Sequence, residues 1–142
     1  MAFALERLSR LLSGITTSSI VETEPEGAAG EILSDQPLYL NAVVTGTTTL
    51  DARALLGELL AVERDYGRER PYPGAARTLD LDLILFGDAE INESDLHVPH
   101  PRFRTRFFVL GPLVEIAPGM IDPMTQLTVG ELLRRLLRDE GR

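Results

Sequence analysis

Hydrophobic residues recur at helical spacing in three stretches of the chain. These residues are Leu5, Leu8 and Leu12; Leu55, Leu59, Val62 and Tyr66; and Leu132, Leu133, Leu136 and Leu137. Each stripe predicts an amphipathic helix, the first over residues 3–13. Asp51 can cap the second helix and Gly67 can end it, while Thr128 and Glu131 form a capping box for the third.

Between the helical stretches lie segments rich in β-branched residues. Residues 15–23 and 39–49 are predicted as strands, residues 79–86 as a strand closed by a Gly87-Asp88 turn, and residues 89–92 as a short edge strand. Residues 24–35 and 68–78 have loop composition. The order of helices and strands predicts an α+β sandwich with helices packed on a largely antiparallel sheet. A length of 142 residues suits one domain, residues 1–142.

Composition and charge narrow the classes of function. The net charge of −8 argues against nucleic acid as a partner, since such partners need a basic surface. Cysteine is absent, which excludes disulfides and thiolate catalysis. No apolar run suits a membrane span, and the first residues lack the pattern of a signal peptide. A soluble, cytoplasmic protein is therefore expected.

Two aspartates in the predicted strand at 79–86 are candidates for metal binding. Side chains alternate along a strand, so Asp80 and Asp82 share the face opposite to the leucines, with α-carbons about 6.6–7 Å apart. Both carboxylates could contact Mg²⁺, which prefers oxygen ligands and is often shared with substrate phosphates. Alternating acidic residues on a half-exposed strand usually indicate only a solvent-exposed face, so the pattern alone is weak evidence for a metal site.

Arginines beside these aspartates favour a phosphate ligand. They form two groups, which are Arg64, Arg68, Arg70 and Arg77, and Arg102, Arg104 and Arg106. A guanidinium matches phosphate oxygens bidentately, although any one arginine is more often a surface ion-pair partner. Carboxylates for a metal next to guanidinium groups for phosphate charge are what a magnesium–nucleotide complex requires.

The ordered motifs resemble the 6-hydroxymethyl-7,8-dihydropterin pyrophosphokinase family. The signature-like part is Gly67-Arg68-Glu69-Arg70 followed by Arg77-Thr78-Leu79-Asp80-Leu81-Asp82 and the strand up to Gly87. Upstream, Gln36-Pro37 and Tyr39-Leu40-Asn41-Ala42 are similar to a family block. Downstream, similar blocks are Val98-Pro99-His100, Arg106-Phe107-Phe108, and Pro112-Leu113 through Ala117-Pro118. The resemblance spans most of residues 15–118.

This resemblance implies a reaction and a set of residue roles. Diphosphate would pass from ATP to the pterin hydroxymethyl group, giving AMP, in folate biosynthesis. Asp80 and Asp82 would hold two Mg²⁺ ions, and Arg70 and Arg77 would join them as catalytic residues. The other roles implied are contacts to the triphosphate from Arg70, Arg77, His100 and Arg106, a place near the nucleotide for Glu63 and Arg68, and pterin contacts from Thr23, Tyr39, Asn41 and Phe108.

The chain also departs from the family pattern. A strand with a Gly-Ser-Asn-Leu-type turn normally opens the family's ferredoxin-like sandwich, and this first strand is missing here. An Arg-Trp-Gly-Pro lid is replaced by residues 73–76, Pro-Gly-Ala-Ala, which predicts slower turnover or weaker substrate retention.

Three hypotheses stay open at this point. The first is the pyrophosphokinase, and the second is a truncated or degenerate member that binds nucleotide or a partner without catalysis. The third is another Asp-x-Asp transferase, which leaves Tyr39, Asn41 and Phe108 unexplained. Oligomeric state is not readable, although an uncovered sheet edge would favour self-association.

Overall fold

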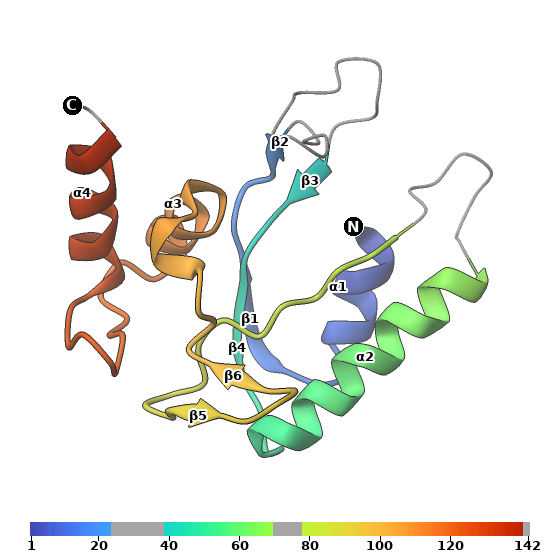
Figure 1. Ribbon diagram of the computed structural model, residues 1–142. Coiled ribbons are helices and arrows are strands. Elements are labelled where there is room, and N and C mark those ends of the chain that lie inside the picture. Colours follow the sequence, from blue (N-terminus) through green and yellow to red (C-terminus); the bar gives the residue numbers. More distant parts are fainter. Residues whose placement is uncertain (24–38, 70–77, 141–142) are drawn as a thin grey trace. The chain divides into compact units, whose positions relative to one another are not determined.

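The computed structural model describes residues 1–23, 39–69 and 78–140, and Figure 1 labels its elements. The chain divides into two compact units. Unit 1 is Met1–Ile15, Gly46–Pro101 and Asp122–Gln126, and unit 2 is Thr16–Thr45, Arg102–Ile121 and Leu127–Arg142. The two units alternate along the sequence, so neither is a continuous stretch of chain.

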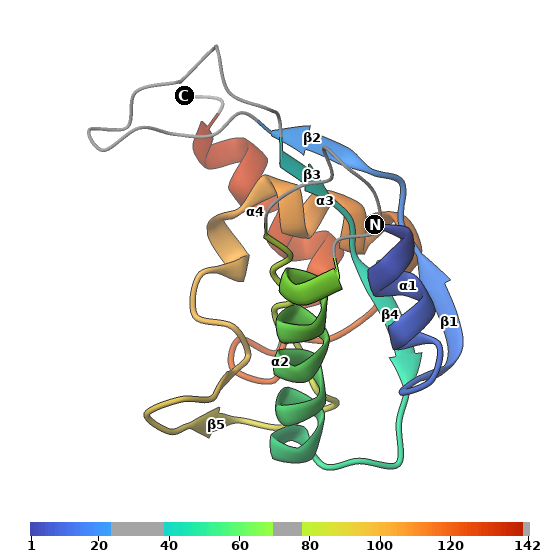
Figure 2. The same ribbon diagram turned by 90° about the vertical axis from the view of Figure 1, so that its right-hand side faces the viewer.

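Two helices, α1 (Ala2–Leu8) and α2 (Ala52–Glu69), form the helical part of unit 1. The carboxylate of Asp51 accepts a hydrogen bond from the Ala54 backbone N–H at 2.7 Å, which confirms the predicted cap of α2. The predicted stripe on α2 is buried throughout. Phe3 of α1 packs edge-to-face on Tyr66 with ring centroids 5.3 Å apart, and Figures 1 and 2 both show the helices side by side.

The predicted ends of both helices were wrong. Helix α1 ends at Leu8 rather than near residue 13, because a turn follows in which the Ser9 hydroxyl donates to the Glu6 carbonyl. Helix α2 continues through Gly67 to Glu69. Gly67 has the open space and helical backbone of an ordinary surface position, so its weak helix propensity is outweighed by the packed stripe before it.

A short hairpin completes the described core of unit 1. Strands β5 (Ile91–Asn92) and β6 (His97–Val98) pair antiparallel, with Ile91 opposite Val98. Val98 and Leu96 are buried against Ala52 at the start of α2, and Figure 1 shows the hairpin beside that first turn. The predicted edge strand at residues 89–92 is thus confirmed in its second half.

Residues 78–86 differ from their prediction, because the structure assigns no strand to them. Burial alternates only at the start: Leu79, Leu81 and Leu83 are half-buried while Asp80 and Asp82 are exposed. From residue 83 to 86 every position is half-buried. A strand is defined by pairing, and no strand of the described residues pairs with this segment. The predicted turn at Gly87-Asp88 is present, with Gly87 at φ +54°.

Each of the two long strands predicted nearer the N-terminus is divided in two. The observed strands are β1 (Ser13–Thr17), β2 (Val21–Thr23), β3 (Tyr39–Asn41) and β4 (Val44–Thr47). β1 neighbours β4, and β2 pairs antiparallel with β3. The break lies at buried Ser18, whose N–H donates to the Val43 carbonyl while its hydroxyl accepts from the Val43 N–H. A side chain that bonds the backbone interrupts the ladder here.

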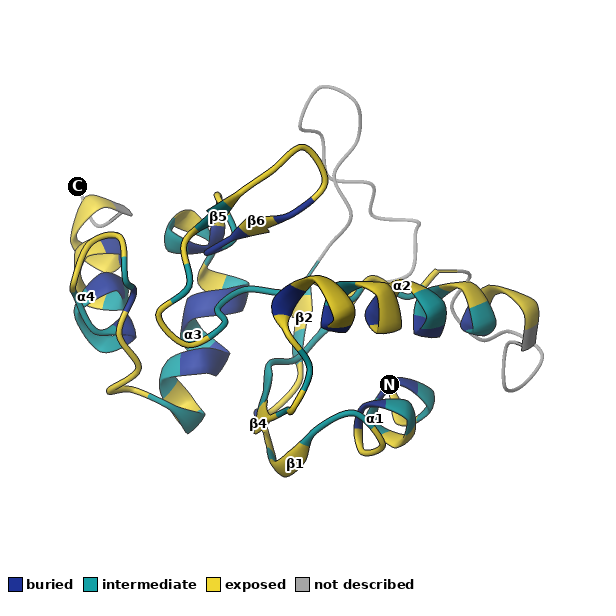
Figure 3. Cartoon of the chain, turned by 90° about the horizontal axis from the view of Figure 1, so that it is seen from below, coloured by how far each residue is buried: buried dark blue, intermediate teal, exposed yellow. Residues whose placement is uncertain are grey.

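Unit 2 is built around η1 (Phe103–Thr105), α3 (Phe107–Ile116) and α4 (Val129–Glu140), which pack on one another. Phe103, Leu110 and Val129 are fully buried, and Figure 3 shows the buried faces of α3 and α4 in dark blue. The Thr128 hydroxyl accepts from the Glu131 N–H at 3.1 Å, so the predicted cap of α4 is confirmed. Glu115 of α3 accepts from the Ser19 N–H and hydroxyl, at 2.8 and 2.6 Å.

Helices and small two-stranded sheets occur together, which confirms the α+β class. Among the described helices, none combines the length and the apolar character that crossing a bilayer requires.

Candidate functional site

The two candidate metal ligands lie on an exposed side of unit 1. Asp80 and Asp82 both reach solvent and are separated by half-buried Leu81. The Leu81 N–H donates to the Glu63 carboxylate of α2 at 2.6 Å. This hydrogen bond attaches the segment that carries the aspartates to α2, and the point of attachment, Leu81, lies between Asp80 and Asp82.

The charges of both aspartates also affect the pKa of the Glu63 carboxyl. Burial raises the pKa of the Glu63 carboxyl above its ordinary value, the Leu81 N–H opposes that shift, and the charges of Asp80 and Asp82 add to it. Glu63, Asp80 and Asp82 therefore make a locally acidic site. Within the described ranges no set of three or more such ligands surrounds a common point. Two carboxylates with room for other ligands fit Mg²⁺, which keeps waters and shares phosphate oxygens.

His100 is placed by the same segment of unit 1. Its backbone N–H donates to the Ile84 carbonyl at 2.8 Å, and its side chain is half-buried. Arg68 lies in the last turn of α2 and is exposed. Arg70 and Arg77 lie outside the described residues, as does the lid-like stretch at residues 73–76.

Three candidate pterin residues meet on the β2–β3 pair of unit 2. Thr23 is directly opposite Tyr39, and Val21 is opposite Asn41. The Asn41 side-chain amide donates to Thr23 Oγ1 at 2.9 Å and to the Val21 carbonyl at 3.2 Å. Tyr39 leaves 58% of its surface exposed, so its ring face is available for stacking on a flat ligand.

Phe108 and Arg106, the other candidates in unit 2, lie together at the start of α3. The Arg106 guanidinium is 5.6 Å from the centroid of the half-buried Phe108 ring, which is cation–π distance. The structure thus joins a predicted triphosphate contact to a predicted pterin contact. Phe107, next in sequence, is 47% exposed and packs its ring against Gly111.

The described candidates fall into two groups. Unit 1 holds Glu63, Arg68, Asp80, Asp82 and His100, which are nucleotide and metal candidates; unit 2 holds Thr23, Tyr39, Asn41, Arg106 and Phe108. Direct contacts link Asn41 to Thr23 and Arg106 to Phe108, and both contacts lie within unit 2. Three contacts were not foreseen, namely Glu63 with Leu81, Asn41 with Thr23, and Arg106 with Phe108. The sequence marks Glu63 as next to the buried stripe, because it directly follows Val62, but it does not reveal the partner Leu81.

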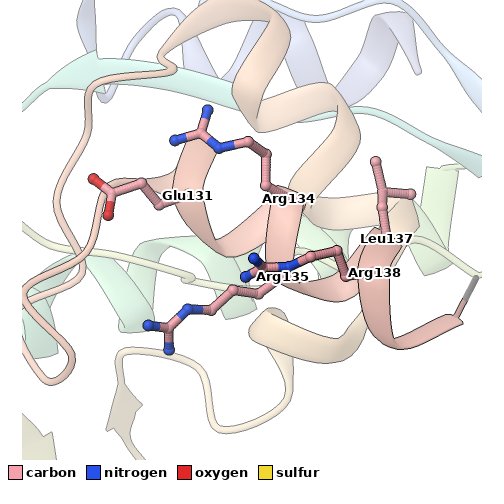
Figure 4. A pocket seen from close by; sticks show the side chains of 5 residues that line it. All are labelled: Glu131, Arg134, Arg135, Leu137 and Arg138. Atoms are coloured by element: carbon pink, nitrogen blue, oxygen red, sulfur yellow. The ribbon is translucent and has the colours of Figure 1, made fainter.

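A shallow hollow on α4 adds nothing to these groups. Glu131, Arg134, Arg135, Leu137 and Arg138 line it, and Figure 4 shows the side chains spread over the helix surface. The three arginines are exposed, with Arg138 in the last turn. They form a solvated helix face, with Arg138 favourable to the helix dipole.

Comparison with known proteins gives consistent matches. The sequence pattern of the family described as 7,8-dihydro-6-hydroxymethylpterin-pyrophosphokinase (HPPK) matches residues 1–118. A 2-amino-4-hydroxy-6-hydroxymethyldihydropteridine pyrophosphokinase of Haemophilus influenzae is 38% identical over 134 residues, covering 93% of this chain and 80% of the relative. A protein of the same name from Synechocystis sp. is 44% identical over 101 residues, or 71% of this chain.

Some relatives are much longer than this chain. The chain spans about half of the Synechocystis protein, since the match covers 52% of it. The folic acid synthesis protein fol1 of Pneumocystis carinii is 33% identical over 135 residues, which are 94% of this chain but 18% of that protein. With a family pattern over most of its length and several relatives that carry one name, the chain belongs to the HPPK family.

Proposed function

We propose that this chain transfers diphosphate from ATP to the hydroxymethyl group of 6-hydroxymethyl-7,8-dihydropterin, in folate biosynthesis. The observation that carries the proposal is the exposed pair Asp80 and Asp82, fastened by Glu63, in a chain whose family match covers residues 1–118. The relatives are named as pterin pyrophosphokinases. Both units act as one pyrophosphokinase domain, residues 1–142, working in the cytoplasm.

Bond making and breaking are balanced in a single displacement. The pterin hydroxymethyl oxygen bonds to the β-phosphorus of ATP and releases its proton to solvent water. The bond from that phosphorus to the oxygen bridging the α- and β-phosphates breaks, and AMP leaves with that oxygen. Catalysis of this kind is mainly positioning and charge stabilisation.

The chain's own residues divide these tasks. Asp80 and Asp82 would hold magnesium, two ions in the full proposal, and the bound metal would neutralise developing phosphate charge. Arg70, Arg77, His100 and Arg106 contact the triphosphate, with Arg68 and Glu63 near the nucleotide. Tyr39 and Phe108 stack on the two faces of the pterin ring. Asn41 hydrogen-bonds the polar edge of the ring, and Thr23 lies beside it as a further pterin contact. The exposed Tyr39 ring and the Asn41–Thr23 bond support this assignment.

The proposal includes the family's ferredoxin-like sandwich, in which residues 79–86 act as a strand. Their alternating burial at residues 79–83 supports this. The strand expected beside them is the family's first one, whose Gly-Ser-Asn-Leu-type turn does not occur in these 142 residues. Adding that strand at the N-terminus should protect the backbone amides of residues 79–86 from hydrogen exchange. Unchanged exchange would contradict this part of the proposal.

Single-turnover release of AMP tests the function. The chain is mixed with ATP, Mg²⁺ and the dihydropterin, and AMP is followed by chromatography. Asp80→Ala and Asp82→Ala should each slow the reaction by roughly 10²- to 10³-fold, and chelation of the metal should abolish it. Asp88→Ala is the control, since Asp88 is an exposed aspartate on the following turn. Absence of AMP with the parent chain, or equal rates in all four proteins, would overturn the proposal.

A further inference from the structure

Glu63 occupies an unusual position on α2. Its neighbours Leu59, Val62 and Tyr66 are buried with 6%, 1% and 6% of their surfaces exposed, while Glu63 itself is half-buried at the edge of that stripe. Because the backbone of Glu63 belongs to a long, packed helix, its side chain starts from a fixed position. It can therefore serve as a fixed point for residues 78–86, which pair with no strand among the described residues.

The carboxylate uses this fixed position to hold a backbone group. Glu63 Oε2 accepts from the Leu81 N–H at 2.6 Å, a short, charge-assisted hydrogen bond. Leu81 stands between Asp80 and Asp82, and alternation directs its side chain away from theirs. Holding the Leu81 amide thus sets the directions of the Asp80 and Asp82 side chains together.

The charges of Asp80 and Asp82 also act on Glu63. After burial, the charges of Asp80 and Asp82 are causes of the raised pKa of Glu63. Negative charges near one another repel, and hydrogen-bond donors or a bound cation offset that repulsion. The Leu81 N–H holds Glu63, and Asp80 and Asp82 are left exposed for a cation.

We propose that Glu63 is a positioning residue for the metal ligands, acting through the Leu81 amide rather than as a nucleotide contact or a ligand itself. The inference rests on the proposed function, because it takes Asp80 and Asp82 as the ligands. Groups that orient metal ligands without touching the metal typically contribute 10- to 100-fold in metal affinity. Shortening the Glu63 side chain, so that its carboxylate no longer contacts the Leu81 N–H, should therefore weaken metal binding even where the negative charge is kept.

Two substitutions of Glu63 separate the effect of side-chain length from the effect of negative charge. Glu63→Gln keeps the length and an oxygen acceptor but removes the charge. Glu63→Asp keeps the charge but withdraws the carboxylate by one methylene, so that it no longer reaches Leu81. Glu58→Asp is the matched control, since Glu58 is an exposed glutamate on the same helix. Binding of Mn²⁺ with α,β-methylene-ATP is measured by electron paramagnetic resonance, and the Leu81 amide proton by NMR.

Positioning predicts that Glu63→Asp weakens Mn²⁺ binding about 10- to 100-fold and moves the Leu81 amide proton upfield. Glu63→Gln should stay within about threefold of the parent, the loss that a single partly screened charge causes. Equal losses in Gln and Asp variants, or a loss in Gln alone, would overturn the inference and make the charge the active feature. No loss in either would also overturn it.

The proposed function has a separate readout in the same experiment. If Asp80→Ala and Asp82→Ala abolish Mn²⁺–nucleotide binding while Glu63→Asp does not change it, the inference fails and the metal site stands. If neither alanine substitution changes binding, the metal site fails, and the role of Glu63 fails with it.

Discussion

Asn41 donates a side-chain hydrogen bond to the hydroxyl of Thr23, with 2.9 Å between Nδ2 and Oγ1. A second bond from the same nitrogen reaches the Val21 carbonyl at 3.2 Å, so both amide hydrogens are used inside the β2–β3 pair. The Asn41 amide can then offer a ligand only its oxygen, which is an acceptor. A pterin presents N–H groups at its polar edge, which suit such an acceptor.

Replacing Thr23 should therefore weaken pterin binding through Asn41. Thr23→Val removes the hydroxyl but keeps the shape, and should raise the pterin Kd about tenfold, because the amide loses the bond that orients it. Thr23→Ser retains the hydroxyl and should bind nearly as the parent does. Calorimetric titration with the pterin checks this, and equal Kd values for Val and Ser variants would contradict it.

Arg106 should affect both substrates, because its guanidinium lies over the Phe108 ring. Arg106→Ala is expected to raise the KM for ATP and for pterin, each by about 3- to 10-fold, from loss of the proposed phosphate contact and of support for the Phe108 ring. Arg106→Lys keeps the charge without the planar stacking group, so the ATP value should recover more than the pterin value.

The control for Arg106 is Arg104→Ala, an arginine placed 4.8 Å over the buried Phe103 ring in the same unit. It should leave both KM values near those of the parent. A change in ATP kinetics alone for Arg106→Ala would mean that the Phe108 contact has no part in pterin binding.

Acid should remove the contribution of the Arg7–Asp65 pair that links α1 to α2. The hydrogen bond from Arg7 holds the pKa of Asp65 below its ordinary value of 3.8, against an opposing effect of burial. A lowered folded-state pKa means stability that is present above pH 3.8 and lost as pH falls through the folded-state value. Urea titrations should show Arg7→Met less stable than the parent at pH 7, with the difference shrinking below pH 3.8.

Arg10→Met serves as the comparison for Arg7→Met. Arg10 pairs with Glu6 four residues earlier on an open surface, where both side chains are more than half exposed. Such pairs contribute little, so this variant should match the parent across the pH range. A pH-independent loss in Arg7→Met would show that packing on Phe3, not the ion pair, is what Arg7 supplies.

Leu110 should be among the costliest positions to shorten. It is fully buried in α3, and Leu110→Ala should lower the free energy of unfolding by about 2–5 kcal/mol through lost burial and the cavity left behind. Leu137→Ala on α4 is the control, because Leu137 is 49% exposed and should cost less than about 0.5 kcal/mol. Urea denaturation measures both, and similar losses in the two variants would contradict the described core.

Sequence pattern predicted the amphipathic elements well and the apolar ones poorly. The stripe of α2 and the caps at Asp51 and Thr128 follow from local spacing and local hydrogen bonds, which the sequence displays directly. Helix α3 was not predicted, because Phe107–Ile116 is apolar on nearly all sides and contains Gly111 and Pro112. Hydrophobic periodicity does not identify a helix that is apolar on all sides.

Strand limits depended on contacts that sequence does not show. The break between β1 and β2 comes from Ser18 bonding Val43, a residue 25 positions away. The alternation at residues 79–83 correctly placed Asp80 and Asp82 on the exposed side, yet strand pairing requires a neighbour as well as a pattern. Candidate residues could be named from motifs, whereas Glu63 on Leu81 and Arg106 on Phe108 required coordinates.

The alternation of the two units along the sequence bears on how the protein is made. Unit 1 includes Asp122–Gln126, and unit 2 begins at Thr16 and needs α4. During synthesis on the ribosome, unit 1 lacks Asp122–Gln126 and unit 2 lacks α4 until those later residues have emerged. Contacts between distant residues slow folding because the intervening loops must be closed first. Partly made chains would expose apolar surface for that interval, which is the kind of surface that chaperones protect.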